Sequence, residues 1–94
     1  MNNFNFTVIE GNLVDDPYDG SFTIVSTERQ TDIDGRQVNA EVSFDVHTTG
    51  KLADVVQKYL KKGARVLVSG KLANDGSAFY LDGKEVNFLS PAGA

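Results

Sequence analysis

The 94-residue sequence contains no cysteine, no tryptophan, two prolines and a single histidine. The absence of cysteine excludes disulfides and thiolate metal sites. The one histidine, His47, leaves no set of imidazole metal ligands, and no phosphate-binding or dinucleotide-binding glycine pattern is present. We interpret His47 as a solvated residue of a strand. The sequence therefore predicts a protein that is not an enzyme and needs no metal or cofactor.

Long apolar runs are also missing. No segment approaches the roughly 18 apolar residues of a membrane span. The first residues, Met1 to Phe4, lack the basic and apolar regions of a signal peptide. We therefore expect a cytoplasmic protein without a membrane contact, and the length fits one domain with a modest core.

The net charge of −4 argues, taken alone, against a nucleic-acid partner. Proteins that bind nucleic acids usually present a basic face to the phosphates. The charges here are unevenly distributed, because bases cluster between Lys51 and Lys71 while acids gather in Asp15–Asp19 and around Asp32 and Asp34. The charge by itself favours a neutral or acidic interaction module.

One segment has the apolar spacing of a helical face. Its apolar residues follow the i, i+3, i+4, i+7, i+8 pattern: Leu52, Val55, Val56, Tyr59 and Leu60. We predict that Lys61 and Lys62 lie in the last turn, where cations suit the helix dipole, and that Gly63 ends the helix. Tyr59 and the helix lysines are interpreted as structural.

Strand patterns surround this helix. We predict strands at Phe4–Val14, Ser21–Thr31, Val38–Thr48, Ala64–Leu72 and from Ala78 onward. Hairpin tips are predicted at residues 32–35 and 74–76, and Asp82-Gly83 is interpreted as a bulge or bend inside the last strand. A single helix between the third and fourth strands of a five-stranded chain is typical of an OB fold, a small Greek-key barrel. We predict this domain over residues 1–89, with residues 90–94 a disordered end or the start of a truncated tail.

Several short phrases follow one another along nearly the whole chain. They are FDV (44–46), GKLA (50–53), YLKKG (59–63), RVLV (65–68) and GKL (70–72), with FTI (22–24), ER (28–29) and DG (34–35) before them and EVNFL (85–89) after them. Near the N-terminus, Gly11 precedes Asp16-Pro17. The order and spacing of these phrases resemble those of the bacterial and phage single-stranded DNA-binding protein family.

This resemblance implies an OB-fold protein that binds single-stranded DNA without sequence preference in replication, recombination and repair. It also implies a homo-oligomer, a tetramer or else a dimer, assembled through the first strand. Such proteins recruit repair partners through a long tail. The sequence stops before one, either because a tail was trimmed near residues 91–94 or because the protein has none, so tail-mediated partners are not expected. Two alternatives remain open: a protein-interaction or assembly module on the same fold, and an RNA-binding OB protein.

The positions where the family commonly carries stacking aromatics are polar in this sequence. They correspond to Gln30, Ser43 and Thr49, and the loop with the fourth position is shortened to residues 74–77. By strand parity, Ser43, Asp45, His47 and Thr49 form the outward face, while Phe22 and Phe44 point into the core. The remaining candidates for contact with a nucleic acid, through phosphates or base stacking, are Arg29, Arg36, Lys71, Lys84, Tyr18, Phe79 and Tyr80.

Overall fold

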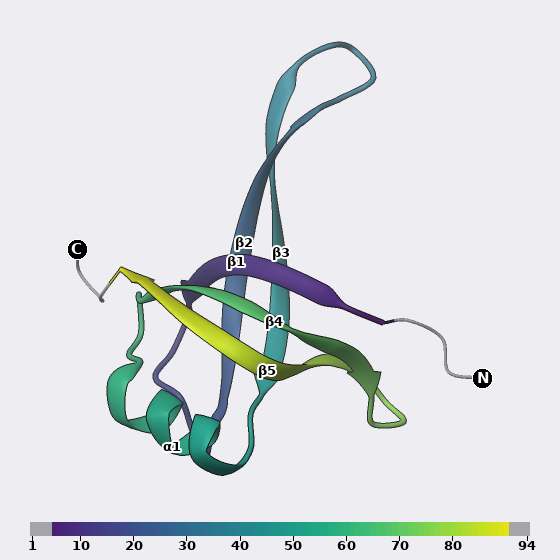
Figure 1. The fold of residues 1–94 in the computed structure, drawn as a ribbon. Coiled ribbons are helices and arrows are strands. Elements are labelled where there is room, and N and C mark those ends of the chain that lie inside the picture. The colour runs from purple at the N-terminus through teal and green to yellow at the C-terminus, as the bar shows by residue number, and fades with distance from the viewer. Residues whose placement is uncertain (1–4, 91–94) are drawn as a thin grey trace.

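The computed structural model describes residues 5–90 and shows a closed five-stranded barrel with one helix packed at its lower end (Figure 1). The strand order around the barrel is β1-β2-β3-β5-β4, which confirms the predicted OB fold with its helix between the third and fourth strands. The elements are β1 (Thr7–Leu13), β2 (Ser21–Thr31), β3 (Gln37–His47), α1 (Gly50–Tyr59), β4 (Arg65–Asn74) and β5 (Phe79–Ser90).

Strand β1 pairs mainly with β4. It pairs with β4 from Thr7 to Asn12, whereas its pairs with β2 are confined to Asn12 and Leu13. A Cβ atom on Gly11 would lie 2.6 Å from the carbonyl oxygen of Val25, so glycine permits the close approach at which β1 meets β2. The observed strand is shorter than the predicted one, because it starts at Thr7. Phe4, where the predicted strand began, lies outside the described residues.

Strands β2 and β3 form a long hairpin. Eleven residue pairs connect them, from Ser21 opposite His47 to Thr31 opposite Gln37, and the outer half projects from the barrel as an arm (Figure 1). At the tip, the Asp32 carboxylate accepts hydrogen bonds from the N–H groups of Asp34 and Arg36, both at 2.9 Å. The predicted hairpin tip is confirmed.

The helix ends earlier than the sequence predicts. Leu60 follows Tyr59 in an extended conformation, with its N–H bonded to the carbonyl of Val56, and its side chain is buried. Burying Leu60 in the barrel stops the helix, so Lys61 and Lys62 lie in the following turn and Lys58 is the basic residue of the last helical turn. Gly63 has the positive φ expected of a stop, 91°, but it lies inside that turn.

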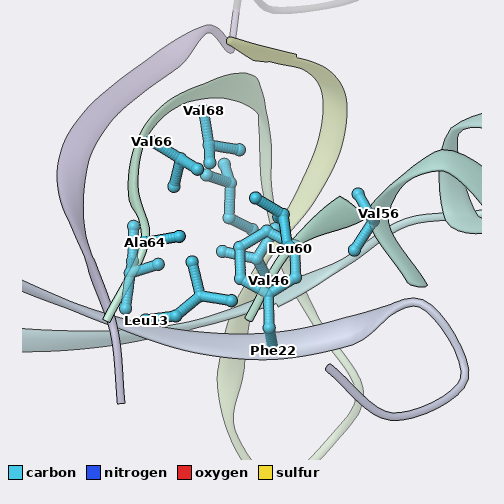
Figure 2. Packing of buried hydrophobic residues seen from close by; sticks show 10 residues of the cluster. Leu13, Phe22, Val46, Val56, Leu60, Ala64, Val66 and Val68 are labelled. Carbon is cyan, nitrogen blue, oxygen red and sulfur yellow. The ribbon is translucent and has the colours of Figure 1, made fainter. Parts of the chain in front are cut away.

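The core fills the barrel and the space between the barrel and the helix (Figure 2). Its inward parity agrees with the sequence prediction, since Phe22 is buried and Phe44 packs against the core from a partly buried position. Of the predicted helical face, Val56 and Leu60 are buried, whereas Tyr59 is 59% exposed. The core residues are Leu13, Phe22, Ile24, Val46, Val56, Leu60, Ala64, Val66, Val68 and Leu81.

The barrel closes through a short seam between β3 and β5. These parallel strands share two residue pairs, Val46 with Leu81 and His47 with Asp82. Strand β5 also pairs with β4 along most of its length, with a register shift next to Gly70 that leaves Lys84 as the extra residue. This irregularity confirms the bulge predicted near Asp82-Gly83.

Strand β5 continues to Ser90, one residue past the predicted domain boundary, because Ser90 pairs with Arg65. The rest of the predicted terminal segment, residues 91–94, lies outside the described residues. Within residues 5–90, the helix is too short and too polar to span a membrane.

Candidate nucleic-acid interface

An aromatic pair lies on the outside of the β3–β5 seam. The rings of His47 and Tyr80 stack with their centroids 4.3 Å apart and their planes inclined by 18°. His47 is the last residue of β3, and Tyr80 precedes the buried Leu81 on β5, so both side chains point away from the core. Both side chains are partly exposed. A flat, partly exposed pair of rings is a surface on which a nucleobase can stack.

Two predicted cations lie next to this pair. Lys71 on β4 is opposite Asp82 on β5, and Asp82 is in turn opposite His47 across the seam. The Nζ atom of Lys84 forms an ion pair of 3.1 Å with the same Asp82 carboxylate. One carboxylate therefore lies between two lysines, which leaves a net positive charge beside the rings on a protein that is acidic overall.

The other two predicted aromatics, Phe79 and Tyr18, are more exposed than the pair. Phe79 is the first residue of β5 and is 67% exposed. It follows the turn at Asp75, whose carboxylate accepts hydrogen bonds from the N–H groups of Ser77 and Ala78 at 2.9 and 3.0 Å. These bonds, that from Ser77 first, hold the pKa of Asp75 below its usual value.

Tyr18 lies in the loop between β1 and β2 and is 84% exposed. It exchanges two backbone hydrogen bonds of 2.9 Å with Ser21, which is paired with His47. The helix fixes this loop, because the Gln57 amide donates to the carbonyl of Pro17 and accepts from the N–H of Gly20. The structure thus brings Tyr18 to the same end of the sheet as the aromatic pair.

The two predicted arginines are separate from this cluster. Arg29 lies eight residues beyond Ser21 along β2, a span of roughly 26 Å at the usual rise of a strand. Arg36 is farther still, at the tip of the arm, where its carbonyl accepts a hydrogen bond from the N–H of Asp32. Both residues are exposed. The seven candidates therefore do not form one cluster. Tyr80, Lys71 and Lys84 lie at the seam with Tyr18 at the same end of the sheet, Phe79 lies on the opposite face of β5 from Tyr80, and the two arginines lie on the arm.

Acidic groups border the aromatic pair on its other side. A hollow of about 180 Å³ next to His47 is lined by the carboxylate residues Asp15, Asp16 and Asp45. The Asp45 carboxylate accepts a hydrogen bond of 2.8 Å from the Thr23 hydroxyl. Because carboxylates repel phosphates, this side of the rings is less favourable for an anionic ligand than the side where the lysines lie.

The polar replacements at the family's stacking positions are all exposed. Ser43 lies on β3, Gln30 lies on the arm, and Thr49 is the N-cap of α1 without a capping bond from its hydroxyl. None of the three provides a ring. The sequence predicted His47 as a solvated strand residue; it lies on β3 and is partly exposed, and its stacking on Tyr80 was not predicted. Its position on the outward face next to the closing strand was the available signal, but its contact with Tyr80 depends on the seam register.

The sequence of the chain matches a known protein family. A sequence model described as the single-strand binding protein family matches residues 4–79. The match covers most of the chain, so the chain belongs to this family. A search of curated proteins found no match.

Solved structures of similar fold are single-stranded DNA-binding proteins from diverse organisms. The Plasmodium falciparum protein, in a complex with single-stranded DNA, superposes with a TM-score of 0.81 at 18% identity, covering 96% of this chain and 98% of that chain. The small protein of Streptomyces coelicolor superposes with a TM-score of 0.74 at 21% identity, covering 94% of this chain and 95% of that chain. A deletion mutant of the Thermus aquaticus protein superposes with a TM-score of 0.79 at 19% identity. The match covers 93% of this chain but only about half (51%) of that chain. At these identities the similarity establishes the fold.

Proposed function

We propose that this domain binds single-stranded DNA without sequence preference and without catalysis, and that it coats exposed strands in replication, recombination and repair. The observation that carries the proposal is the His47–Tyr80 stack with Lys71 and Lys84 beside it. Stacking rings and nearby cations are the two components with which OB folds hold single strands. Family membership and the DNA complex of the Plasmodium falciparum protein support the same role.

A bound strand would place bases against the ring pair and phosphates near the lysines and, farther along, near Arg29 and Arg36. The three polar family positions lack stacking contacts worth about 1–3 kcal/mol each, so we expect weak binding. Each phosphate contact contributes a slope of about −0.7 to the logarithm of affinity against the logarithm of salt for a single strand. Because few cations are available, the salt dependence should be shallow.

Fluorescence anisotropy of a labelled dT oligonucleotide, long enough to wrap an oligomer, tests this function. We expect saturable binding at low salt that weakens as salt is added and that duplex DNA does not displace at equal concentration. The absence of binding at low salt would contradict the proposal. Preferential competition by an RNA oligonucleotide of the same length would assign the face to RNA instead.

A protein-interaction module is the second candidate function. The acidic hollow formed by Asp15, Asp16 and Asp45 and the polar residues at the stacking positions favour it. In that case the Tyr80→Ala variant would leave the behaviour toward any oligonucleotide unchanged. The same anisotropy titration therefore distinguishes the two functions.

We also propose assembly into a tetramer, or a dimer, through β1. Support comes from the outer edge of Thr7–Gly11, since these residues pair with β4 and not with β2. Val8 on this edge is 49% exposed and lines a groove together with Val42 and Phe44. The proposed role places the protein with the chromosome, in the cytoplasm.

A further inference from the structure

A second surface lies at the end of the helix, away from the aromatic pair. It is a pocket of about 410 Å³, which we call the helix-end pocket, and its size is within the roughly 300–1,000 Å³ of ligand sites. Phe88 in its wall is eight residues along β5 from Tyr80, a strand length of roughly 26 Å. The lining residues are Tyr59, Leu60, Lys61, Ala64, Phe88, Leu89 and Ser90.

The wall of this pocket is apolar and open. Tyr59 is 59% exposed, and Phe88 and Leu89 are each 46% exposed, although all three carry large apolar surfaces. The buried residues Leu60 and Ala64 form part of the lining and belong to the barrel core, so this part of the wall is rigid. Contiguous exposed apolar side chains around a hollow indicate a surface that a partner covers.

The rim of the pocket is positively charged. Lys61 lines it, Lys62 follows, and the Nζ atom of Lys58 lies 5.2 Å from the centroid of the Tyr59 ring. Within residues 5–90, none of these lysines forms an ion pair, and no acidic residue lines the pocket. A carboxylate from elsewhere in the chain already binds at this turn, since Asp16 accepts a hydrogen bond of 2.8 Å from the N–H of Lys62.

We propose that the helix-end pocket binds an acidic peptide segment of another protein, which inserts one bulky apolar side chain between Tyr59, Phe88 and Leu89. The charge of the rim selects a partner with carboxylates, and the hollow selects the apolar side chain. A nucleic acid fits less well, because Lys58 occupies one face of the Tyr59 ring and the lining of the hollow, apart from Lys61 and Ser90, is apolar. This inference does not depend on the proposed DNA binding.

The test uses a fluorescein-labelled octapeptide that contains four glutamates and one central phenylalanine, titrated with the wild-type chain. We expect saturable anisotropy that weakens with added salt. Replacing the phenylalanine by serine, or the glutamates by serine, should weaken binding by about tenfold or more. Undetectable binding of the parent peptide at low salt would overturn the proposal.

Matched protein variants locate the site. Lys61→Glu should weaken peptide binding several-fold and Lys58→Glu/Lys61→Glu by about tenfold or more, while Lys51→Glu, the same charge change at the other end of the helix, should not. Leu89→Ser tests the apolar wall, with circular dichroism confirming that each variant is folded. Equal losses for Lys51→Glu and Lys61→Glu would reduce the effect to net charge and contradict the site.

Two further readouts separate the other occupants. If a dT oligonucleotide displaces the peptide, and Lys61→Glu weakens the binding of both equally, the pocket is a nucleic-acid surface and the proposal is wrong. If Lys61→Glu lowers the mass measured by light scattering, the pocket is an interface between copies of this chain, which also overturns it. We expect no competition and an unchanged mass.

Discussion

The stack of His47 on Tyr80 joins two residues that are far apart in the sequence but meet where the barrel closes. Because a base stacked on such rings gains about 1–3 kcal/mol, we expect Tyr80→Ala to weaken binding of a dT oligonucleotide by roughly 5- to 150-fold. The slope of affinity against salt should stay unchanged, since no phosphate contact is removed. Anisotropy titrations at several salt concentrations measure both quantities.

His47→Ala should reproduce this loss, because removing one ring disrupts the pair. Tyr59→Ala provides the control, since Tyr59 is a more exposed tyrosine at the helix end, and we expect no change in DNA affinity. If Tyr80→Ala and Tyr59→Ala weaken binding equally, the stack is not the base-binding surface.

Gly70 is a second position where a single atom matters. A Cβ atom there would collide with the carbonyl oxygen and carbon of Asp82, both backbone atoms that cannot rotate away. We expect Gly70→Ala to lower the free energy of unfolding by about 1–3 kcal/mol, the range for overpacked interiors. For a domain of this size, each kcal/mol lowers Tm by roughly 4–8 °C.

Thermal unfolding followed by circular dichroism measures this loss. Ser69→Ala, next to Gly70 on β4, controls for the addition or removal of small groups at the bulge and should change Tm little. An unaltered Tm in Gly70→Ala would show that β4 and β5 can separate locally without cost.

At this scale, strand parity predicted which side chains face the core, because alternation in β-strands follows from backbone geometry alone. It placed Phe22 inside and His47 outside. The ring partner of His47 could not be predicted, since the register of the parallel β3–β5 seam depends on how the whole barrel closes.

Among the elements, the β2–β3 arm carries the two predicted arginines. It holds Arg29 and Arg36 well away from the seam, so these arginines can contribute charge without taking part in stacking. We expect Arg29→Ala/Arg36→Ala to weaken DNA binding at low salt and to make the salt slope shallower by up to about 1.4, at about 0.7 per lost contact. Anisotropy with a dT oligonucleotide at four or more salt concentrations gives the slope.

The control for the arm is Lys51→Ala/Lys62→Ala, which removes the same charge from exposed positions on and after the helix. If both double variants change the slope equally, the arginines act through net charge and not through contact. An unchanged affinity in the arm variant would remove Arg29 and Arg36 from the site.

For the helix, the sequence predicted the start correctly but placed the end too late. Apolar spacing correctly predicted a helix after Gly50, because the 3.6-residue period is a local property. The spacing also included Leu60, and this made the predicted helix too long. Leu60 is buried by leaving the helix, and only the tertiary position of the barrel core explains that change.

For the whole molecule, net charge was a poor guide and residue order a good one. The acidic total of −4 conceals a separation of charge, with carboxylates around Asp15 and Asp45 on one side of the aromatic pair and lysines on the other. Phrase order along the chain predicted the fold and the family, because each phrase corresponds to an element with a fixed place in the barrel. The site positions stay a prediction, since they depend on substitutions particular to this chain.

The proposed assembly of the molecule depends on the exposed edge of β1. An edge of this length offers unpaired backbone groups to a second copy, and pairing two such edges about a two-fold axis would bring both Val8 side chains into the interface region. A lysine at position 8 in both copies would add two charges to that region and oppose pairing. We therefore expect Val8→Lys to lower the mass measured by light scattering from that of a tetramer or dimer toward that of a monomer. Val55→Lys makes the same substitution on the exposed face of the helix, at a similarly exposed valine, and should leave the mass unchanged. If Val8→Lys keeps its circular dichroism spectrum and its mass, the copies assemble through another surface.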